Sequence, residues 1–347
     1  MAHHDVLNEF SEASAEWFST TFQSPTAPQV QGWPTIASGE HTLILAPTGT
    51  GKTLTAFFWG LDQLISVPPP EEKTHRTRIL YISPLRALAV DVEKNLQAPL
   101  QGTRLAAERL GSTYHEPDVA IRSGDTPQAE RRRLASHPPD LLITTPESLY
   151  LMLTSKVRET LAGVETIIID EIHALAATKR GAHLAVSLER LEQITKKPPQ
   201  RIGLSATQRP LEEIAKFLGG YADGKARPVS IVDAGISKEL EVEVVVPLED
   251  MGKLGEVVTD DPVSDPAAAG PTRRSIWPSI HPRLLELIQE NNSTIVFVNA
   301  RRLAERLAIR LNELALDGEN RAAEAEGTSP EPGHELVMAH HLSLIHI

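Results

Sequence analysis

The sequence contains no cysteine and no excess of positive charge. Without cysteine there is no disulfide scaffold, no thiolate ligand for zinc and no cysteine nucleophile, and this composition fits a reducing compartment. Acidic residues number 46 against 34 basic ones, which gives a formal net charge of −12. This balance excludes a protein that coats nucleic acid through general positive charge, so any nucleic-acid site must be local.

Long apolar stretches are also missing. No run of about 18 apolar residues is present, so the sequence predicts no membrane-spanning segment. The first residues, MAHHDVLNEF, carry an early acid and no apolar core, unlike a secretory signal. We therefore expect a cytoplasmic protein that has no membrane partner.

The chain of 347 residues, 41% hydrophobic and 23% charged, is long enough for two globular domains. Short apolar segments rich in Ile, Leu and Val recur along it, as expected for strands buried on both faces. These segments are 42–47, 78–84, 119–124, 141–146, 166–171, 201–207 and 229–234. Apolar residues at helical spacing follow Lys52 and surround Leu188. Such alternation predicts an α/β fold, with a parallel sheet covered by helices on both faces.

The pattern changes after residue 237. Residues 247–278 are acidic, with Pro, Gly and Ala, which is typical of a solvated linker. Beyond them the sequence predicts, in order, a helix (282–290), a strand (293–299), a helix (301–315), an acidic loop (317–335) and a short strand (337–341). We expect a first domain, then a connecting strand with the linker, then the start of a second domain. The bounds of these three parts are 1–237, 238–280 and 281–341.

The strongest local pattern is the sequence APTGTGKT at residues 46–53, between an apolar strand and an amphipathic helix. This context is typical of a phosphate-binding loop. Gly49 and Gly51 allow the backbone N–H groups to face phosphate oxygens, and the start of the helix favours an anion. We expect Lys52 to neutralise the β- and γ-phosphates and the Thr53 hydroxyl to ligate Mg²⁺. The expected nucleotide-binding residues of the loop are Thr48, Gly49, Thr50, Gly51, Lys52 and Thr53.

Two further polar patterns end apolar strands. Asp170 and Glu171 follow the segment TIII, where two adjacent carboxylates repel each other unless a cation is nearby. We therefore expect Asp170 to hold Mg²⁺ through water and Glu171 to polarise the water that attacks the γ-phosphate. The hydroxyls of Ser205 and Thr207 are expected to bond these carboxylates and to sense the γ-phosphate. His173, beside the acidic pair, is expected to take part in this coupling.

Taken in order, APTGTGKT, SPLRAL, TTPES, DEIH and SAT resemble the motifs of the superfamily 2 helicases, the DEAD/DEAH-like ATPases. Residues 81–92, 180–191 and 294–314 are most similar to the Lhr (large helicase-related) group of DNA helicases. The resemblance extends from about Phe22 to His341. It implies a P-loop, RecA-like domain with a parallel sheet, followed by an incomplete second RecA-like domain, and it implies ATP and Mg²⁺ as ligands.

The resemblance also assigns an adenine site. Gln29 matches the glutamine whose amide pairs with N6 and N7 of adenine. Trp17, Phe18 and Phe22 are candidates to stack on the base, and the resemblance does not choose between them.

Three loops match the segments that hold a single-stranded backbone in this family. Hydroxyls, backbone N–H groups and an arginine suit phosphate contact without base readout. The residues concerned are Pro84, Leu85, Arg86, Gly124, Asp125, Thr145, Pro146 and Glu147. Arg131, Arg132 and Arg133 form a basic run, which we interpret as a solvated helix face.

The function implied is an ATP-dependent helicase that moves 3′→5′ on nucleic acid in the cytoplasm, associated with the nucleoid. Single-stranded DNA is favoured as the partner, while RNA or a hybrid stays open. The alternatives are an RNA helicase and a nucleotide-binding fragment without motor activity. Neither the LSGGQ-like signature of ABC ATPases nor the NKxD-like base reader of GTPases is present.

The sequence departs from the family pattern at two places. Ala46 stands where the commonest phosphate loop has its first glycine. After His340 and His341 the family continues with Gly-Ser, whereas here LSLIHI follows at 342–347. We interpret this tail as foreign sequence. The arginine finger of the second domain is then absent, so we expect slow turnover, because such a finger contributes about 10³–10⁵ in rate.

Overall fold

The structure is a computed structural model that describes residues 5–47, 49–206, 210–235, 241–245, 277–326 and 335–339. The chain divides into two compact units, 1–238 and 239–347, and each is described by itself. Within the described ranges, no helix is both long and apolar enough to cross a lipid bilayer.

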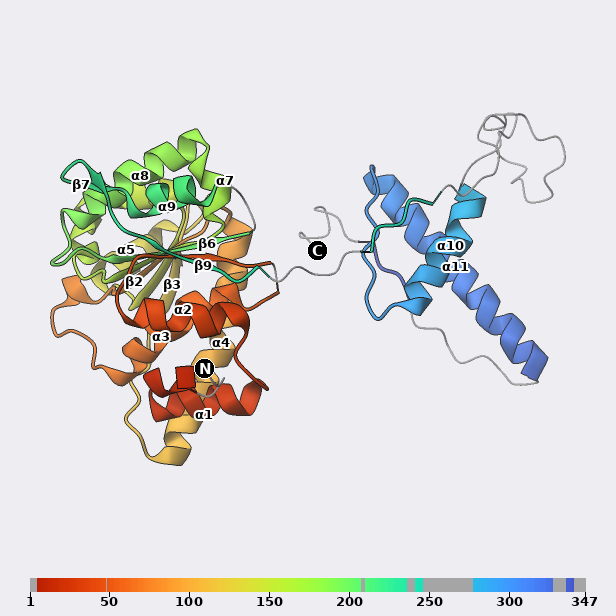
Figure 1. The fold of residues 1–347 in the computed structure, drawn as a ribbon, viewed down its shortest axis with the longest axis horizontal. Coiled ribbons are helices and arrows are strands. Elements are labelled where there is room, and N and C mark those ends of the chain that lie inside the picture. The colour runs from red at the N-terminus through yellow and green to blue at the C-terminus, as the bar shows by residue number, and fades with distance from the viewer. Residues whose placement is uncertain are drawn as a thin grey trace. The chain divides into compact units, whose positions relative to one another are not determined.

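The first unit is built on a seven-stranded sheet with the order β3-β4-β2-β5-β6-β1-β9, in which all neighbouring strands are parallel. The strands are β1 (Thr42–Leu45), β2 (Ile79–Ile82), β3 (Val119–Arg122), β4 (Leu141–Thr144), β5 (Thr166–Ile169), β6 (Gln200–Ser205) and β9 (Ser230–Asp233). Six of them lie within the apolar segments of the sequence, and β6 begins one residue before the segment 201–207. The predicted parallel α/β fold is therefore confirmed (Figure 1).

Helices cover both faces of this sheet, because alternate strand residues point to opposite sides. Leu43, Leu80 and Ile167 pack against α6 (Pro146–Leu153), α7 (Ile172–Ala176), α8 (Lys179–Glu192) and α9 (Leu211–Gly219). Ile44 and Tyr81 face the other side, which is covered by α2 (Ala27–Ala37), α3 (Lys52–Ser66) and α4 (Arg86–Leu110). In Figure 1, α7, α8 and α9 lie above the sheet, and α2 and α3 lie below it.

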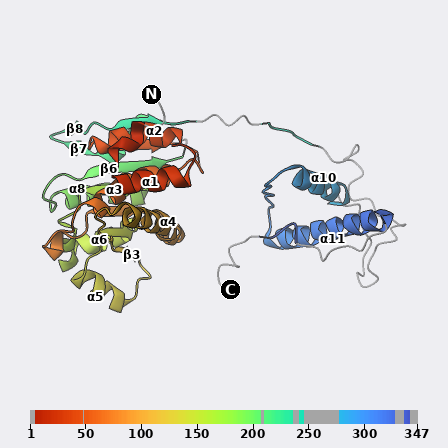
Figure 2. The ribbon, with the colours of Figure 1, turned by 90° about the horizontal axis from the view of Figure 1, so that it is seen from below.

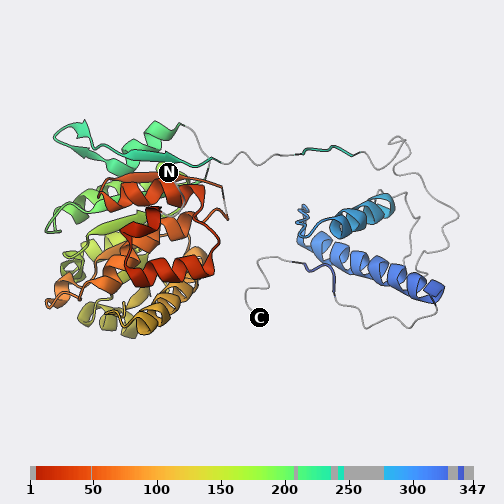
Figure 3. The ribbon, with the colours of Figure 1, turned by 60° about the horizontal axis from the view of Figure 1, so that its bottom comes forward.

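A third apolar cluster adds α1 (Glu12–Thr21) outside this second layer. Trp17 and Phe18 of α1 pack there with Trp33 of α2 and Phe58 of α3. Figure 2 shows α1 beside α4, and Figure 3 shows the red N-terminal helices side by side. The remaining elements of the unit are η1 (Asp5–Glu9), η2 (Lys73–His75), η3 (Lys156–Leu161), α5 (Gln128–Ser136) and the two-stranded β7 (Tyr221–Ala222) and β8 (Lys225–Ala226).

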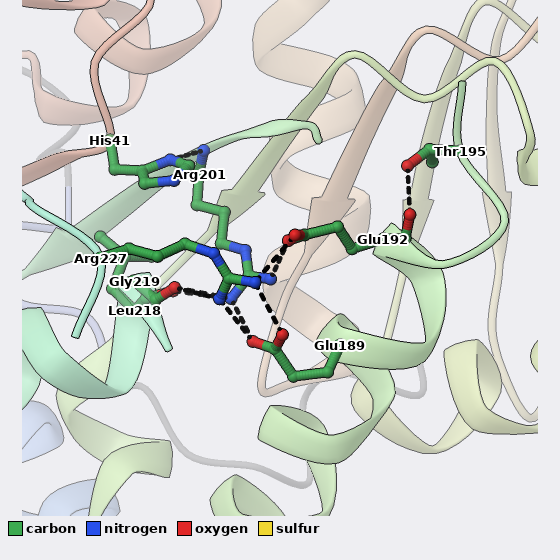
Figure 4. Close-up of polar contacts among 8 residues, drawn as sticks. All are labelled: His41, Glu189, Glu192, Thr195, Arg201, Leu218, Gly219 and Arg227. Atoms are coloured by element: carbon green, nitrogen blue, oxygen red, sulfur yellow. Dashed lines mark hydrogen bonds and ion pairs between the residues drawn. The ribbon is translucent and has the colours of Figure 1, made fainter. Parts of the chain in front are cut away.

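An ionic network around the buried Arg201 lies near the start of β6, at the amino edge of the sheet (Figure 4). Arg201, 1% exposed, bonds Glu189 at 3.0 Å, Glu192 at 2.7 Å and two backbone carbonyls at the end of α9. Arg227 bonds the same two carboxylates, and the Nδ1 atom of His41 accepts the backbone N–H of Arg201 at 3.0 Å. The network joins α8, α9 and β6, so we assign it to the fold and not to a ligand site.

The second unit contains α10 (Trp277–Glu290) and α11 (Arg301–Glu326), which pack against each other (Figure 1). The helix predicted over 282–290 lies within α10. The helix predicted over 301–315 is longer than expected, so the predicted loop over 317–335 is wrong for residues 317–326. The reason is composition: the stretch is rich in Ala and Glu, which favour helix.

The strands predicted beyond the first unit do not form in the residues that the structure describes there. Residues 241–245 and 293–299 form no strand, and the side chains of Ile295 and Phe297 are exposed. Residues 337–339 are also irregular, and both backbone polar groups of Val337 bond the Asn312 side chain at 2.9 Å. A strand needs a neighbour for its N–H and C=O groups, and the described part of this unit provides none. The predicted linker up to residue 276 and the segment 340–347 lie outside the described residues.

Candidate functional site

The register of the sheet brings the predicted site loops to one edge. Leu45 pairs with Ser205, and Ile82 pairs with both Thr144 and Ile169. Since all these strands are parallel, their carboxyl ends meet along this edge, where ligands bind in open α/β sheets. The loops after β1, β5 and β6, which we call the β1–β5–β6 loops, follow neighbouring strands. The loops after β2, β3 and β4, the β2–β3–β4 loops, follow the other three.

The phosphate loop makes a tight turn before α3. Gly49 and Gly51 have φ angles of +81° and +83°, which favour glycine. A Cβ atom on Gly51 would also lie 3.0 Å from the Nε2 atom of Gln29. Both the backbone angle and the available space therefore favour glycine at this position. Lys52 is 8% exposed, and its ammonium group donates to the carbonyl of Ala46 at 2.6 Å. The lysine is thus folded back along the loop that it was predicted to serve. Thr53 follows it in the first turn of α3, and Thr48 lies outside the described residues.

Gln29 lies beside this loop, as predicted, but its amide is already engaged. It is 3% exposed, and its Oε1 atom accepts the backbone N–H of Thr26 at 2.8 Å in a capping box that begins α2. The Thr26 hydroxyl donates to the carbonyl of Thr50 at 2.9 Å. The start of α2 is therefore bonded directly to the phosphate loop. The Oε1 atom keeps a second lone pair, so its bond to Thr26 does not by itself prevent pairing with adenine.

The expected base-stacking aromatics separate into two groups. Trp17 and Phe18 are buried in the α1 cluster with Phe58, so the prediction that either ring stacks on adenine is wrong. The cause is the apolar face of α1, which packs into the protein. Phe22 is 41% exposed and is the candidate left among the three.

Asp170 is held by a side chain of β2 and by the backbone that follows β5. Its Oδ2 atom accepts the hydroxyl of Tyr81 at 2.5 Å, and its Oδ1 atom accepts the backbone N–H of Glu171 at 2.9 Å. Burial, and then the Asp170 carboxylate, raise the pKa of Tyr81, so the phenol stays protonated and donates. The ring of Tyr81 stacks on Phe57 of α3 at 4.7 Å. Tyr81 is not among the predicted site residues, and its one signal in the sequence is a phenol near the end of an aliphatic strand.

Glu171 has a strained backbone. Its φ and ψ angles are 43° and 44°, in the left-handed region that costs a non-glycine residue about 1–3 kcal/mol. The Nδ1 atom of His173 lies 3.3 Å from the Glu171 carboxylate and 3.3 Å from the hydroxyl of Ser205. The Ser205 hydroxyl contacts this imidazole and the carbonyl of Ala206. The expected direct bond from Ser205 to the carboxylates is thus replaced by a contact through His173. Thr207 lies outside the described residues.

The loops after β2 and β4 are more open. Leu85 and Glu147 are exposed, whereas Pro84, Thr145 and Pro146 are buried. The hydroxyl of Thr145 accepts the backbone N–H of Ser148, so it caps α6, and Pro146 occupies the first turn of that helix. Arg86 begins α4. These predicted residues therefore lie at two helix starts that face the same sheet edge.

The loop after β3 is held by an arginine from the next helix. Gly124 and Asp125 are exposed. Arg131 donates to the carbonyls of Thr126 at 2.8 Å, Gly124 at 2.7 Å and Ser123 at 3.4 Å. The interpretation of the basic run as a solvated face is therefore wrong for Arg131. Its two neighbours are exposed, and Arg133 forms a surface ion pair with the preceding turn.

Comparison with known proteins decides the family. Residues 26–214, more than half of the chain, match the DEAD/DEAH box helicase family. The chain belongs to the DEAD/DEAH box helicases. The phosphate loop, the DEIH strand end and the three open loops of this helicase chain all fall within the matched range.

The chain is also similar to named helicases over most of its length. It is 49% identical over 329 residues to the "Lhr helicase/ probable uracil glycosylase" of Mycolicibacterium smegmatis, covering 95% of this chain and 20% of that protein. It is 49% identical over 309 residues to the "Lhr helicase/uracil glycosylase" of Escherichia coli, covering 88% of this chain and 20% of that protein. The helicase chain thus spans about a fifth of the length of these curated relatives.

A solved structure supports the same family at the level of the fold. The chain matches the structure of Mycobacterium smegmatis helicase Lhr bound to ssDNA and AMP-PNP with a TM-score of 0.71 and 49% identity. The match covers 94% of this chain and 38% of the solved one. The resemblance to Lhr helicases that the sequence indicated is therefore confirmed.

Proposed function

We propose that this chain is the ATP-binding part of an ATP-dependent DNA helicase. The observation that carries the proposal is the division of one sheet edge between the β1–β5–β6 loops and the β2–β3–β4 loops. The first group carries a phosphate loop and an acidic strand end, and the second carries hydroxyls, helix starts and exposed backbone. We propose that residues 1–237 form the ATP-binding RecA-like domain and that residues 281–341 begin the second.

Within the β1–β5–β6 loops we assign ATP to the turn before α3. The backbone of Gly49, Thr50 and Gly51, together with Thr48, would surround the phosphates, and Lys52 would leave the Ala46 carbonyl to bond them. Glu171 would accept a proton from the attacking water, and its strained backbone supports a role beyond folding. His173 and Ser205, with Thr207, would couple this group to the bound strand.

The oxygen donors at this edge suit a hard cation. Each carboxylate oxygen of Asp170 keeps a lone pair after its bonds to Tyr81 and Glu171. In the described ranges, no group of three or more His, Asp or Glu side chains could enclose a metal ion. We therefore expect Asp170 and Thr53 to hold Mg²⁺ with phosphate and water, as this cation prefers. Bound there, it would supply charge compensation to the phosphates.

We assign the nucleic acid to the β2–β3–β4 loops, with single-stranded DNA favoured because the similar solved Lhr structure is bound to ssDNA. Contacts would come from Arg86, from Leu85 with Pro84, from Gly124 with Asp125, and from Thr145 with Pro146 and Glu147. On the resemblance alone we propose 3′→5′ movement. We also propose that residues 1–347 lack the arginine finger that the resemblance implies and therefore turn ATP over slowly.

The test uses residues 1–347 and three measurements: binding of a fluorescent ATP analogue, single-turnover hydrolysis, and binding to single-stranded DNA and to RNA of the same sequence. We expect nucleotide binding, slow hydrolysis and DNA binding at least as tight as RNA binding. Tighter binding to RNA would favour an RNA helicase. Nucleotide binding with no affinity for either strand would leave a nucleotide-binding fragment and contradict the proposal.

A further inference from the structure

Arg180 bonds two of the open loops at once. Its Nε and Nη2 atoms donate to the two carboxylate oxygens of Glu147 at 2.6 and 3.2 Å, and Nη2 also donates to the carbonyl of Pro84 at 2.9 Å. Pro84 follows β2 and Glu147 follows β4, so one side chain from a third element fixes the distance between them. A forked bond of this kind is geometrically specific, and lysine cannot reproduce it.

The position of Arg180 is unusual for a cation. It lies in the first turn of α8, where the helix dipole disfavours positive charge, and this turn contains no acid. The start of α8 is also fixed in place. Thr178 accepts the backbone N–H of Gly181 at 3.1 Å, and a Cβ atom on Gly181 would lie 2.1 Å from the carbonyl of Leu175. A helix start this closely packed holds the arginine at a defined place.

The ion pair also compensates the negative charge of Glu147. Glu147 is an exposed carboxylate in a loop proposed to hold phosphates, and an unpaired carboxylate there would repel them. The hydrogen bonds from Arg180 lower the pKa of Glu147, so the carboxylate stays ionised and the bridge stays formed at neutral pH. Because Arg180 is paired with Glu147, we expect the phosphates to be bound by backbone groups, hydroxyls and Arg86.

We propose that Arg180 is a positioning residue for nucleic acid: it joins the loops at Pro84 and Glu147 and screens the Glu147 carboxylate from the bound phosphates. This proposal rests on the proposed function of the β2–β3–β4 loops. It concerns a residue outside the phosphate loop, the DEIH strand end and the loops to which sequence analysis assigned the strand.

The experiment measures the affinity of residues 1–347 for single-stranded DNA as a function of salt. We expect Arg180→Met to weaken binding about tenfold while the salt slope stays unchanged, because Arg180 neutralises no phosphate itself. Adding Glu147→Gln to Arg180→Met should recover part of the loss, since the unpaired carboxylate is then gone while the two loops stay unjoined. The matched control is Arg109→Met, which removes another exposed arginine that joins two helices, through Glu16 at 2.9 Å, and should leave binding unchanged.

Three results would overturn the proposal: unchanged binding by Arg180→Met, a salt slope lower by about 0.7, which marks a direct phosphate ligand, or no recovery in the double variant. Failure of the unaltered chain to bind DNA would instead overturn the proposed function, and this inference with it. Binding of the fluorescent ATP analogue reports folding. If Arg180→Met loses it, Arg180→Lys takes its place, with a several-fold loss expected because an ammonium group cannot bond both loops.

Discussion

At the carboxyl edge of the sheet, the β1–β5–β6 loops hold two buried charged groups, whereas the β2–β3–β4 loops expose several residues. Lys52 and Asp170 are each 8% exposed and bonded within the protein, while Leu85, Gly124 and Glu147 face solvent. The difference fits two kinds of ligand. Hydrolysis needs charged groups fixed in place around the phosphates and the attacking water, and a moving strand needs an open surface of modest contacts.

The two groups also differ in how they are held. Glycine turns and the capping box of α2 shape the phosphate loop, so its own backbone determines its form. The open loops depend on arginines from the helices that follow or lie beside them: Arg131 for the loop after β3, and Arg180 for those after β2 and β4. A variant in one group should therefore leave the other largely intact, and the following predictions test this separation.

The largest effect is expected for Glu171→Gln. The amide cannot accept a proton from water, so single-turnover hydrolysis should fall by about 10²–10⁴. The side chain keeps its size, and binding of the ATP analogue and of single-stranded DNA should be unchanged. Hydrolysis within a factor of a few of the unaltered chain would contradict the assignment of Glu171 as the base.

A smaller effect, on DNA binding and not on hydrolysis, is expected for Arg131→Ala. Loss of its bonds to three carbonyls frees the loop after β3, so affinity for single-stranded DNA should fall about fivefold, with ATP binding unchanged. Arg133→Ala is the control. It removes the same charge, but Arg133 forms an exposed ion pair with Glu130 and does not hold the loop. Equal losses in the two variants would mean that net charge, and not loop geometry, determines the affinity.

Tyr81→Phe tests a side-chain hydrogen bond that joins a strand of the open loops to the acidic strand end. Tyr81 belongs to β2, whose loop is open, yet its hydroxyl bonds Asp170 of the other group at 2.5 Å. Without this donor the carboxylate loses one of its two described bonds. We expect about a tenfold higher Mg²⁺ concentration for half-maximal hydrolysis, with binding of DNA in the absence of nucleotide unchanged. An unaltered Mg²⁺ dependence would show that Tyr81 serves packing alone.

The smallest effect concerns His41, far from both loop groups. Burial, followed by Arg201 and Arg227, lowers the pKa of His41 from 6.5, while Glu192 and Glu189 oppose this. As pH falls below the unfolded value of 6.5, the unfolded chain binds a proton that the folded chain resists. The melting temperature should therefore decrease as pH is lowered from 7.5 to 5.5, by on the order of 1 °C from this group. His41→Gln should reduce the dependence of the melting temperature on pH. An unchanged dependence would contradict a lowered pKa of His41.

Much of the first unit could be predicted because its signals are local. Each buried strand is a short apolar run, and APTGTGKT and DEIH lie directly after two of them, so the parallel sheet brings them to one edge. Contacts between distant residues could not be read this way. Tyr81 and Asp170 are 89 residues apart, and Arg180 is 96 residues from Pro84.

The errors have the same physical origin. Trp17 and Phe18 look like available aromatics until α1 packs them inward, and Arg131 looks like a solvated cation until the loop after β3 turns its carbonyls towards it. In the second unit, residues 293–299 carry a strand pattern, but no described strand lies beside them to complete the hydrogen bonds. Pattern alone predicts what a segment can form, and its neighbours determine what it does form.

The most direct test of the central claim is a paired binding measurement on Lys52→Ala and Arg86→Ala, with single-stranded DNA measured in the absence of nucleotide. Lys52→Ala should lower affinity for the ATP analogue about tenfold or more and leave DNA affinity within a factor of two or so. Arg86→Ala should do the reverse, and should lower the salt slope of DNA binding by about 0.7. If both variants weaken both ligands alike, the two loop groups do not act as separate sites and the account is wrong.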